Sequence, residues 1–426
     1  MNPVSHLAPS TLALGTVASG TVAPGTPAPG TPMPWHVVTG EYPPARGGVS
    51  DYTFAVANAL ANAGDDVHVW CPAVDDAGEG AALKGCATWS AVKVHSIAGS
   101  WSAGDLRRID AALDLTPHPR RLLVQWVPHA YGRRSINLRF CRWVRGRARG
   151  GDVVDLMVHE PGLGFGEGSV AHNAAAAVHR VMLSLLLSHA RRVWIAIPAW
   201  ADTLRRCAVG RSDLEFRWLP IPSTIPVIRS TETVAQLKAQ TLTRRDGLII
   251  GHFSTYPPNV RDALRDMLPG LLAQFPEAQV LLLGAGSEVA AQELRATTAV
   301  ATRIKASGQV GAESLSSHLQ ICDVMLQPYS DGASTRRTTL MAALAHGIPV
   351  VTTLGRLSED FWRSSDAVSV TRAGDTMAMS RAVADVLRDP AGRQRMSAAA
   401  RTIYEQRFSL SHVVDTLRRD ACEVCA

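Results

Sequence analysis

From Trp35 onward, short apolar runs rich in β-branched residues alternate with longer segments whose apolar residues recur at helical spacing. This alternation is typical of βαβ units, in which helices connect parallel strands and cover the sheet. The first predicted helix spans residues 49–63, where Phe54, Ala57 and Leu60 follow that spacing. The strands predicted before residue 200 are 36–39, 67–71, 121–127, 153–159 and 191–197. We therefore expect an α/β protein with parallel sheets.

The alternation stops between residues 220 and 246, where a proline-rich stretch precedes a polar one, and then resumes. The 426 residues are the length of two ordinary domains. The strands of the second series are predicted at 247–253, 279–286, 322–328, 348–353 and 367–370, and the chain after Ala373 is predicted to be almost entirely helical. The predicted units are a tail over 1–32, an N-terminal domain over 33–225, a linker over 226–246, a second Rossmann-like domain over 247–405 and a final segment over 406–426. In open α/β sheets, ligands bind beyond the carboxyl ends of the strands.

The N-terminal tail and the cysteines give information on the cellular compartment of the protein. Residues 1–32 repeat Gly-Thr among alanines and prolines, a composition that cannot bury a core, so we expect disorder there. The tail lacks the basic start of a signal peptide, since the first basic residue is Arg46, and no later run looks long and apolar enough to span a bilayer. Seven irregularly spaced cysteines do not form a disulfide framework, which favours a reducing, cytoplasmic compartment. The lone Cys422-Glu-Val-Cys425 pair lacks a second pair to complete a zinc site, so no metal is predicted.

The first candidate site is Glu41-Tyr-Pro-Pro-Ala-Arg-Gly-Gly48, between the first predicted strand and its helix. Gly47 and Gly48 let the backbone approach a ligand without a Cβ in the way. The helix that follows offers free N–H groups and the positive end of its dipole. This arrangement suits a phosphate or sugar hydroxyls, and the alternative is a proline-glycine turn.

A second candidate is Leu283-Gly-Ala-Gly-Ser-Glu288, which begins like a dinucleotide fingerprint. The sixth position of that fingerprint is Val289 and not glycine, so a nicotinamide cofactor is poorly supported. The turn, with Gly286, either contacts a donor or only connects a strand to a helix.

His159-Glu160-Pro161 follows an apolar strand. A histidine next to a carboxylate at a strand end can orient a substrate or share a proton. The alternative is that His159 is one of the fourteen histidines without a chemical role.

The strongest candidate lies in residues 327–353, which are predicted to form a strand, a loop, a helix, a turn and a strand. Gly332 frees the loop backbone. The hydroxyls of Ser334 and Thr335 are expected to cap the helix and to bind oxygen atoms of a ligand.

Arg336 and Arg337 are predicted at the start of the same helix, where cations oppose the helix dipole unless an anion is bound. Guanidinium groups bind phosphate oxygens in pairs. The loop Asp331–Arg337 therefore predicts a diphosphate site, and the alternative is a pair of solvated arginines.

The net charge of +6 is concentrated in one segment, Arg133 to Arg149, which carries seven arginines. If helical, this segment mixes arginines with Leu138, Phe140 and Trp143. It is a candidate for contact with an anionic acceptor or membrane surface, and the alternative is a solvated face. No nucleic-acid partner is predicted.

Taken in order, these motifs resemble the GT-B glycosyltransferases, in particular the retaining family-4 group, from residue 35 to 420. The resemblance rests on EYPPARGGVSDY, VHEP, LLLGAGSE, ALAHGIPVVTT and the helix containing Tyr404-Glu-Gln-Arg-Phe408. It implies two Rossmann-like domains that face a central cleft, with acceptor on the first and donor nucleotide on the second. It also implies that the helix over 406–426 crosses back to the first domain.

The chain departs from this family at its two glutamates, which lie eight positions apart and fall here on Ser334 and Ala342. Asp331 is a possible displaced first acid if the loop is longer. The family's Arg and Lys after the first strand of the second domain are also missing, and Arg261 is the nearest base. One explanation covers both absences: the cationic clamp has moved from the loop over 251–259 to Arg336 and Arg337.

The resemblance implies that a sugar passes from a nucleotide-diphosphate sugar to a hydroxyl acceptor with retention, in polysaccharide or glycoconjugate synthesis, with no metal or cofactor. The catalytic candidates are His159, Arg336 and Arg337. The donor-binding candidates are Gly47, Gly48, His252, Ser254, Gly286, Asp331, Gly332, Ser334 and Thr335. Glu41 and Glu160 are candidates on the acceptor side. The alternatives are a non-catalytic protein that binds a nucleotide sugar and, less favoured, an NAD-dependent enzyme.

Overall fold

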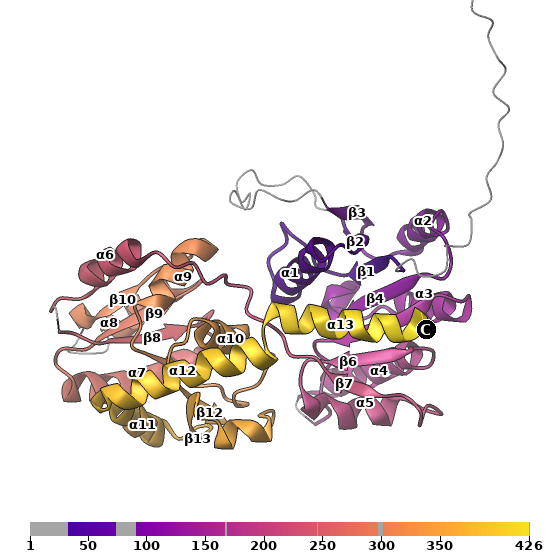
Figure 1. The fold of residues 1–426 in the computed structure, drawn as a ribbon. Helices are drawn as coiled ribbons and strands as arrows, with labels where there is room; N and C mark the ends of the chain where they lie inside the picture. Colours follow the sequence, from indigo (N-terminus) through magenta and orange to yellow (C-terminus); the bar gives the residue numbers. More distant parts are fainter. Residues whose placement is uncertain (1–32, 74–90, 167, 245, 297–300, 426) are drawn as a thin grey trace, which may run out of the picture.

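The computed structural model describes residues 33–73, 91–166, 168–244, 246–296 and 301–425. These residues form two α/β domains that lie side by side, each built on one parallel sheet (Figure 1). The predicted class, with two Rossmann-like domains, is confirmed. The disorder predicted for residues 1–32 concerns a segment outside the described residues.

The first domain has a seven-stranded sheet in the order β3-β2-β1-β4-β5-β6-β7. Its strands are β1 Trp35–Thr39, β2 Val67–Pro72, β3 Val92–Ala98, β4 Arg121–Trp126, β5 Val153–Val158, β6 Arg192–Ile195 and β7 Phe216–Trp218. Its helices are α1 Gly48–Asn62, α2 Ala103–Leu113, α3 Leu138–Arg149, α4 Val170–Leu187 and α5 Ala201–Cys207. Every residue of β4 is buried, because helices cover both faces of a parallel sheet, and this explains why four of its residues, Leu122, Leu123, Val124 and Trp126, are apolar.

The second domain has a six-stranded sheet in the order β10-β9-β8-β11-β12-β13. Its strands are β8 Ile249–Phe253, β9 Gln279–Leu283, β10 Ile304–Ala306, β11 Val324–Gln327, β12 Val350–Leu354 and β13 Val368–Arg372. The helices of this half are α6 Thr231–Thr241, α7 Pro258–Gln274, α8 Ser287–Ala296, α9 Ala312–Gln320, α10 Thr338–Ala345, α11 Thr376–Arg388, α12 Pro390–Arg407 and α13 Leu410–Cys425. The strand order reverses beside β8 here and beside β1 in the first sheet, and ligands bind at such switch points.

Each strand predicted from the sequence is present, and several are shorter than predicted. Three strands were missed, namely β3, β7 and β10, and all three lie at an edge of their sheet. Two of them have only three residues, and β3 carries Lys93 and His95 between its apolar residues. Short, half-polar edge strands give a weak periodic signal.

The end of the chain joins the two domains. Helix α12 packs on α10 of the second domain, and α13 then packs on α1 of the first (Figure 1). Val413, Val414 and Leu417 enter the core of the first domain. The buried carboxylate of Asp420 pairs with three arginines of β6, β7 and the turn before them, at 2.5 Å for Arg191.

Helix α4 corrects one expectation. It is 18 residues long with a mean hydropathy of 1.3, so by length and composition alone it could span a bilayer. Its residues Met182, Leu183, Leu186 and Leu187 are buried in the core of the first domain. This inward face explains the apolar composition.

Candidate active site

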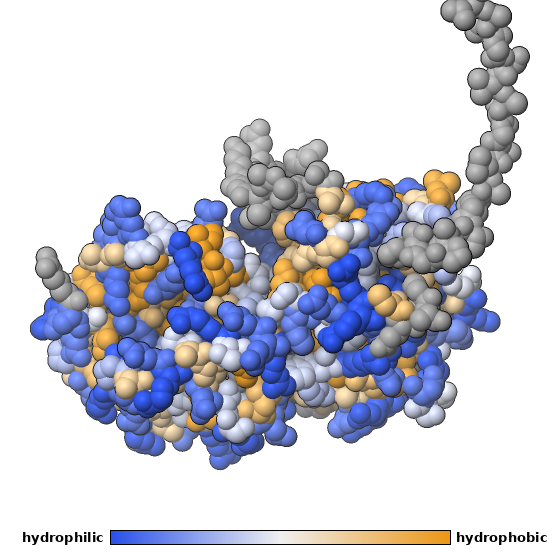
Figure 2. All heavy atoms as spheres, viewed as in Figure 1, coloured by the Kyte–Doolittle hydropathy of each residue, from blue (hydrophilic) through white to orange (hydrophobic). Residues whose placement is uncertain are grey.

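A cleft of about 1220 Å³ lies where the two sheets meet, and the surface is indented between the two lobes (Figure 2). The first domain contributes the loop 43–48 and the start of α1. The second domain contributes the loops that follow β8, β9 and β11, together with the start of α10. The cleft therefore lies beyond the carboxyl ends of the strands, where the sequence predicted it.

On the first domain, Gly47 and Gly48 line the cleft as predicted, and α1 begins at Gly48. A Cβ on Gly47 would collide with the carboxylate of Glu41, so the absence of a side chain at Gly47 makes room for the Glu41 side chain. The Glu41 carboxylate also lies 3.3 Å from His129 Nε2. Gly48 has open space where a Cβ would stand, so it is the glycine that leaves room for a ligand.

His159 lies at the end of β5, beside a smaller hollow of about 340 Å³ that also contacts Glu160 and Arg336. Its Nε2 is 2.8 Å from Gln125 Oε1, and its ring meets Tyr52 edge-on at 4.9 Å. Burial lowers the pKa of His159 to about 3, so the ring is neutral at physiological pH. A neutral ring can accept or donate a hydrogen bond, but so low a pKa makes it a weak base.

The floor of the cleft in the second domain holds two buried acceptors that lack a partner among the described residues. His252 Nδ1 is 2.6 Å from the Leu326 carbonyl and donates to it, which leaves Nε2 as an acceptor with no partner. Gln327 Nε2 donates to the Phe253 carbonyl at 3.3 Å, and its Oε1 has no partner. Burial lowers the pKa of His252 to about 4. Since an unmatched buried acceptor is costly, both atoms favour a ligand with hydroxyl or N–H donors.

The site residue that sequence reasoning missed is Gln327, which was seen only as the end of an apolar strand. A polar side chain that closes a buried strand at the carboxyl edge was the available signal. Ser254, a predicted donor contact, also lines the cleft.

The loop between β11 and α10 contributes two arginines to the cleft. Arg336 and Arg337 both line the cleft, and each donates to the carboxylate of Asp331. Arg336 also pairs across the cleft with Glu160 of the first domain, at 3.1 Å. The Arg337 guanidinium lies 4.9 Å from the ring of Tyr329. Burial alone would raise the pKa of Asp331, but Arg337 and Arg336 outweigh burial and hold that pKa below its ordinary range. We call Arg336 and Arg337 the arginine clamp.

Comparison with known proteins finds a similarity in the second domain. Residues 244–389 match the family model described as "Glycosyl transferases group 1". The second domain is therefore similar to a glycosyltransferase group 1 domain over these residues. A phosphatidyl-myo-inositol mannosyltransferase of Mycobacterium leprae is 27% identical to the chain over 290 residues, which cover 64% of this chain and 75% of the relative.

Solved structures extend the likeness to the whole fold. Anabaena HepE in complex with UDP matches with a TM-score of 0.66 at 16% identity, over 92% of this chain and 100% of that one. The sucrose-phosphate synthase of Thermosynechococcus elongatus matches with a TM-score of 0.67 at 16% identity, over 92% and 99%. With the two facing Rossmann-like domains, these likenesses confirm the predicted GT-B architecture.

In the second domain, Ser334 and Thr335 are buried and do not line the cleft, and α10 begins only at Thr338 with Arg337 as its cap residue. The prediction that their hydroxyls cap this helix is therefore wrong. The Thr335 hydroxyl lies 2.6 Å from a Glu359 oxygen and 2.9 Å from the Ala196 carbonyl of the first domain. Thr335 thus joins the two domains.

Two glycines predicted at the donor site, Gly332 and Gly286, do not line the cleft. Gly332 has φ +91°, and a Cβ there would collide with Ser358 and Gly355, so this glycine lets two loops pack together. At the β9–α8 turn, Gly284 and Ala285 line the cleft, whereas Gly286 is not among its lining residues.

The two positions where the resemblance expects acids, Ser334 and Ala342, present no carboxylate to the cleft. Ala342 is buried inside α10 and offers no oxygen to the cleft. Arg261, the nearest base after β8, pairs with Glu293 at 3.3 Å and is not among the lining residues of the cleft. Among the described residues that line the cleft, Arg336 and Arg337 are therefore the two arginines with which the second domain can contact a diphosphate.

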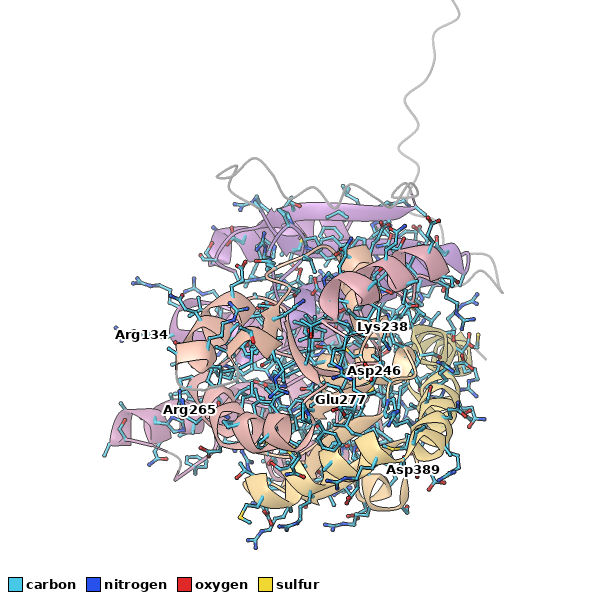
Figure 3. The ribbon with its side chains drawn as sticks, turned by 90° about the vertical axis from the view of Figure 1, so that its left-hand side faces the viewer. Arg134, Lys238, Asp246, Arg265, Glu277 and Asp389 are labelled. Carbon is cyan, nitrogen blue, oxygen red and sulfur yellow. The ribbon has the colours of Figure 1, made fainter. Side chains whose placement is uncertain are left out.

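The basic segment forms α3 from Leu138 onward, and its apolar residues Phe140, Cys141 and Val144 are buried in the core. Arg147 pairs with Asp152 at 2.6 Å and with two further carboxylates. The exposed arginines are Arg133, Arg134, Arg139, Arg142 and Arg149, and Arg134 projects from the surface in Figure 3. The segment therefore offers surface charge, but its apolar face is already covered.

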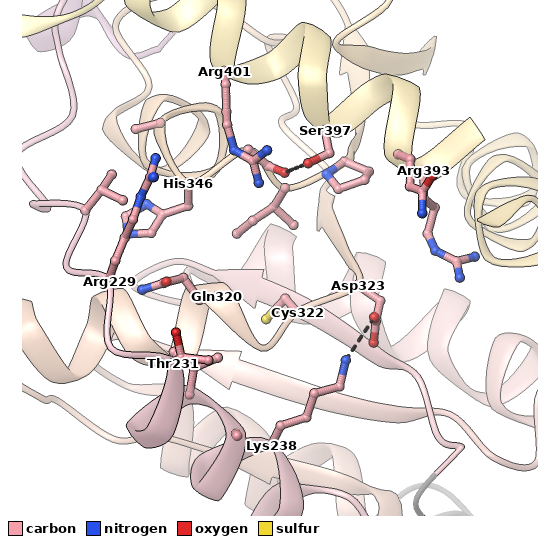
Figure 4. Close-up of a pocket in the computed structure, with 18 of the residues that line it drawn as sticks. Arg229, Thr231, Lys238, Gln320, Cys322, Asp323, His346, Arg393, Ser397 and Arg401 are labelled. Carbon is pink, nitrogen blue, oxygen red and sulfur yellow. Dashed lines mark hydrogen bonds and ion pairs between the residues drawn. The ribbon is translucent and has the colours of Figure 1, made fainter. Parts of the chain in front are cut away.

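A second hollow, of about 1020 Å³, lies at the far end of α10 from the arginine clamp. Arg229 and Arg401 turn toward it from the linker and from α12 (Figure 4). Lys238 is paired with Asp323 at 3.1 Å, and Arg393 donates to the carbonyls of Val386 and Leu387. Two of the four lysines and arginines that line this hollow are thus paired within the protein. The hollow is separate from the cleft between the domains.

Proposed function

We propose that the protein is an enzyme that transfers a sugar from a nucleotide-diphosphate sugar to a hydroxyl acceptor with retention. The observation that carries this proposal is the arginine clamp, which lines the cleft at the carboxyl edge of the second domain. Anabaena HepE, of similar fold, has been solved with UDP and with UDP-glucose, which supports a nucleotide sugar as the donor.

In this proposal the bond between the anomeric carbon and the diphosphate oxygen breaks, and a bond to the acceptor oxygen forms on the same face of the sugar. Negative charge grows on the departing diphosphate, and Arg336 and Arg337 stabilise it. The acceptor proton passes to a departing phosphate oxygen. No metal is assigned a role, because the two guanidinium groups supply the positive charge. His159 contributes hydrogen bonding to the sugar, since its low pKa makes it a poor proton carrier.

The acceptor enters from the first domain, beside Glu41 and Glu160. The M. leprae relative is named for a mannosyl transfer to phosphatidyl-myo-inositol, which makes a mannosyl donor and a lipid-linked acceptor the first pair to test. The exposed arginines around α3 fit an electrostatic contact with an anionic membrane from the cytoplasmic side.

A panel of UDP, GDP and ADP sugars tests the proposal. The purified protein is incubated with each donor and with candidate acceptors, and release of the nucleoside diphosphate is followed together with the anomeric configuration of the product. An acceptor-dependent release with an unchanged configuration is expected. Inversion would refute retention, and NAD as the only stabilising nucleotide in a thermal-shift screen would refute sugar transfer.

The second candidate is a non-catalytic protein that binds a nucleotide sugar. It is favoured by Ser334 and Ala342, which stand where the family carries its two acids. Binding of a nucleotide sugar without any hydrolysis or transfer would support it.

A further inference from the structure

The arginine clamp and the two carboxylates that it contacts carry no net charge together. Arg336 and Arg337 contribute two positive charges, and Asp331 and Glu160 place two negative charges in direct contact with them. An anion that enters the cleft therefore meets a site whose positive charge is already matched. This is unlike an open phosphate site, in which guanidinium groups wait unpaired for the ligand.

The two carboxylates are not equivalent. Asp331 contacts both guanidinium groups, and its side chain is 15% exposed. Glu160 contacts only Arg336, comes from the other domain and is 48% exposed. Attraction between charges is stronger where water is excluded, so Asp331 is the stronger competitor for the clamp.

The clamp nevertheless retains unused donors. The Nε–H groups of Arg336 and Arg337 are buried and have no partner among the described residues. Both arginines line the cleft, and their side chains are 19% and 29% exposed. A guanidinium that gives one edge to Asp331 can present another edge to a ligand with several oxygens.

We propose that Asp331 is an internal counter-anion, a positioning residue that holds both guanidinium groups in the empty enzyme and yields them to the diphosphate of the donor. The inference rests on the proposed function. Because a ligand must outcompete a carboxylate that touches both arginines, the site favours nucleoside diphosphates over nucleosides and monophosphates. Glu160 of the first domain competes for Arg336 in the same way but more weakly. Donor binding therefore also replaces the ion pair between Arg336 and Glu160, which joins the domains.

The sign of one substitution separates this role from a purely structural one. If Asp331 only stabilised its loop, its loss would loosen the clamp and weaken every ligand. If it competes with the ligand, Asp331→Asn removes a negative charge from the site and tightens binding of diphosphates. We expect the Kd of nucleoside diphosphates and of inorganic diphosphate to fall by on the order of 10-fold, and the Kd of the matching nucleoside to stay unchanged.

Isothermal titration of the full-length protein measures these constants with UDP, GDP, ADP, inorganic diphosphate and the three nucleosides. The matched control is Asp360→Asn, which removes the same charge from a fully exposed carboxylate of the same domain. Glu160→Gln is the second variant and is expected to tighten diphosphate binding by a smaller factor. It keeps the inference testable if Asp331→Asn does not fold.

The outcomes distinguish the two proposals. Equal or weaker diphosphate binding by Asp331→Asn overturns the inference, even if the wild type binds nucleotides and transfers a sugar. Tighter binding of inorganic diphosphate by the variant, with no nucleotide bound by either protein, supports the inference and removes the proposed donor. Diphosphate binding by neither protein also overturns the inference.

Discussion

The two walls of the cleft are built on opposite principles. On the wall from the first domain, Glu41 and His159 have partners within the protein: the Glu41 carboxylate fills the space beside Gly47, and His159 is neutral and hydrogen-bonded to Gln125. The wall from the second domain is unfinished, with unpartnered acceptors on His252 and Gln327 and unpartnered donors on the arginine clamp.

This difference indicates where ligand binding energy comes from. Buried polar atoms without partners cost free energy, and a ligand that supplies the partners recovers it. Atoms that are already paired gain little from a ligand. The second domain is therefore expected to bind the donor tightly, and the first to shape the site for the acceptor.

The largest effect is expected from Arg337→Ala. It should lower turnover by on the order of 100-fold or more, because a charged donor aimed at the departing diphosphate is lost. Steady-state kinetics with the active donor measure this effect, and Arg363→Ala, an exposed arginine of the same domain, is the control. Near-normal turnover in Arg337→Ala would remove that residue from the mechanism, and an equal loss in His159→Gln would break the contrast between the two walls.

The next effect compares Gly47, which lines the cleft on the first domain, with Gly332, which lies in the loop that carries the arginine clamp. Gly332→Ala should lower the free energy of unfolding by about 1–3 kcal/mol, since φ is +91° and the new methyl group meets the backbone of Gly355. Gly47→Ala should cost less than about 1 kcal/mol, because its φ is extended and the colliding Glu41 carboxylate can rotate away. Urea unfolding of both variants tests this order, and a larger loss for Gly47→Ala would show that the first wall is the rigid one.

The sequence was sufficient for the fold and for the place of the cleft. Both follow from local patterns, because buried parallel strands read as apolar runs and glycine-rich turns follow them directly in sequence. The edge strands β3, β7 and β10 were missed because they are short or alternate with polar residues. Local reasoning works where the cause of the structure is itself local.

The partners of the site residues could not be read from the sequence. Thr335 was expected at a ligand, but its hydroxyl meets Glu359, 24 residues later in the chain, and Ala196 of the other domain. The pair of Arg336 with Glu160 joins residues 176 positions apart. Such contacts depend on how two domains pack, and nothing in the residues around Thr335 or Arg336 specifies that packing.

A pH series gives a smaller effect and probes both walls at once. His159 and His252 ordinarily titrate near 6.5, but burial lowers their pKa values to about 3 and about 4. As the pH falls, the unfolded chain therefore binds protons that the folded protein does not bind. The free energy of unfolding is highest above about pH 6.5 and falls as the pH drops toward 4. Each histidine should remove about 1 kcal/mol between pH 6.5 and 5.5.

Urea unfolding at pH 7.5 and 5.5 checks this pH dependence. The His159→Gln variant should lose less stability between the two pH values than the wild type does. Equal losses in the two proteins would mean that His159 has the same pKa in the folded protein as in the unfolded chain, and its description as a weak base would then be wrong.

The smallest effect concerns the outer surface of the first domain. Arg142→Gln should weaken binding to vesicles rich in phosphatidylserine by about 1 kcal/mol or less, because one exposed charge near an anionic surface contributes that much. Sedimentation with vesicles at low and physiological salt measures the bound fraction. Arg381→Gln, an exposed arginine of the second domain, is the matched control. Since the apolar residues of α3 are buried, any contact should vanish at high salt. Binding that survives high salt would require apolar insertion and would show that α3 is not the membrane contact. Equal loss of binding in both variants would show that the net charge of the protein, and not the position of the arginines on α3, causes the binding.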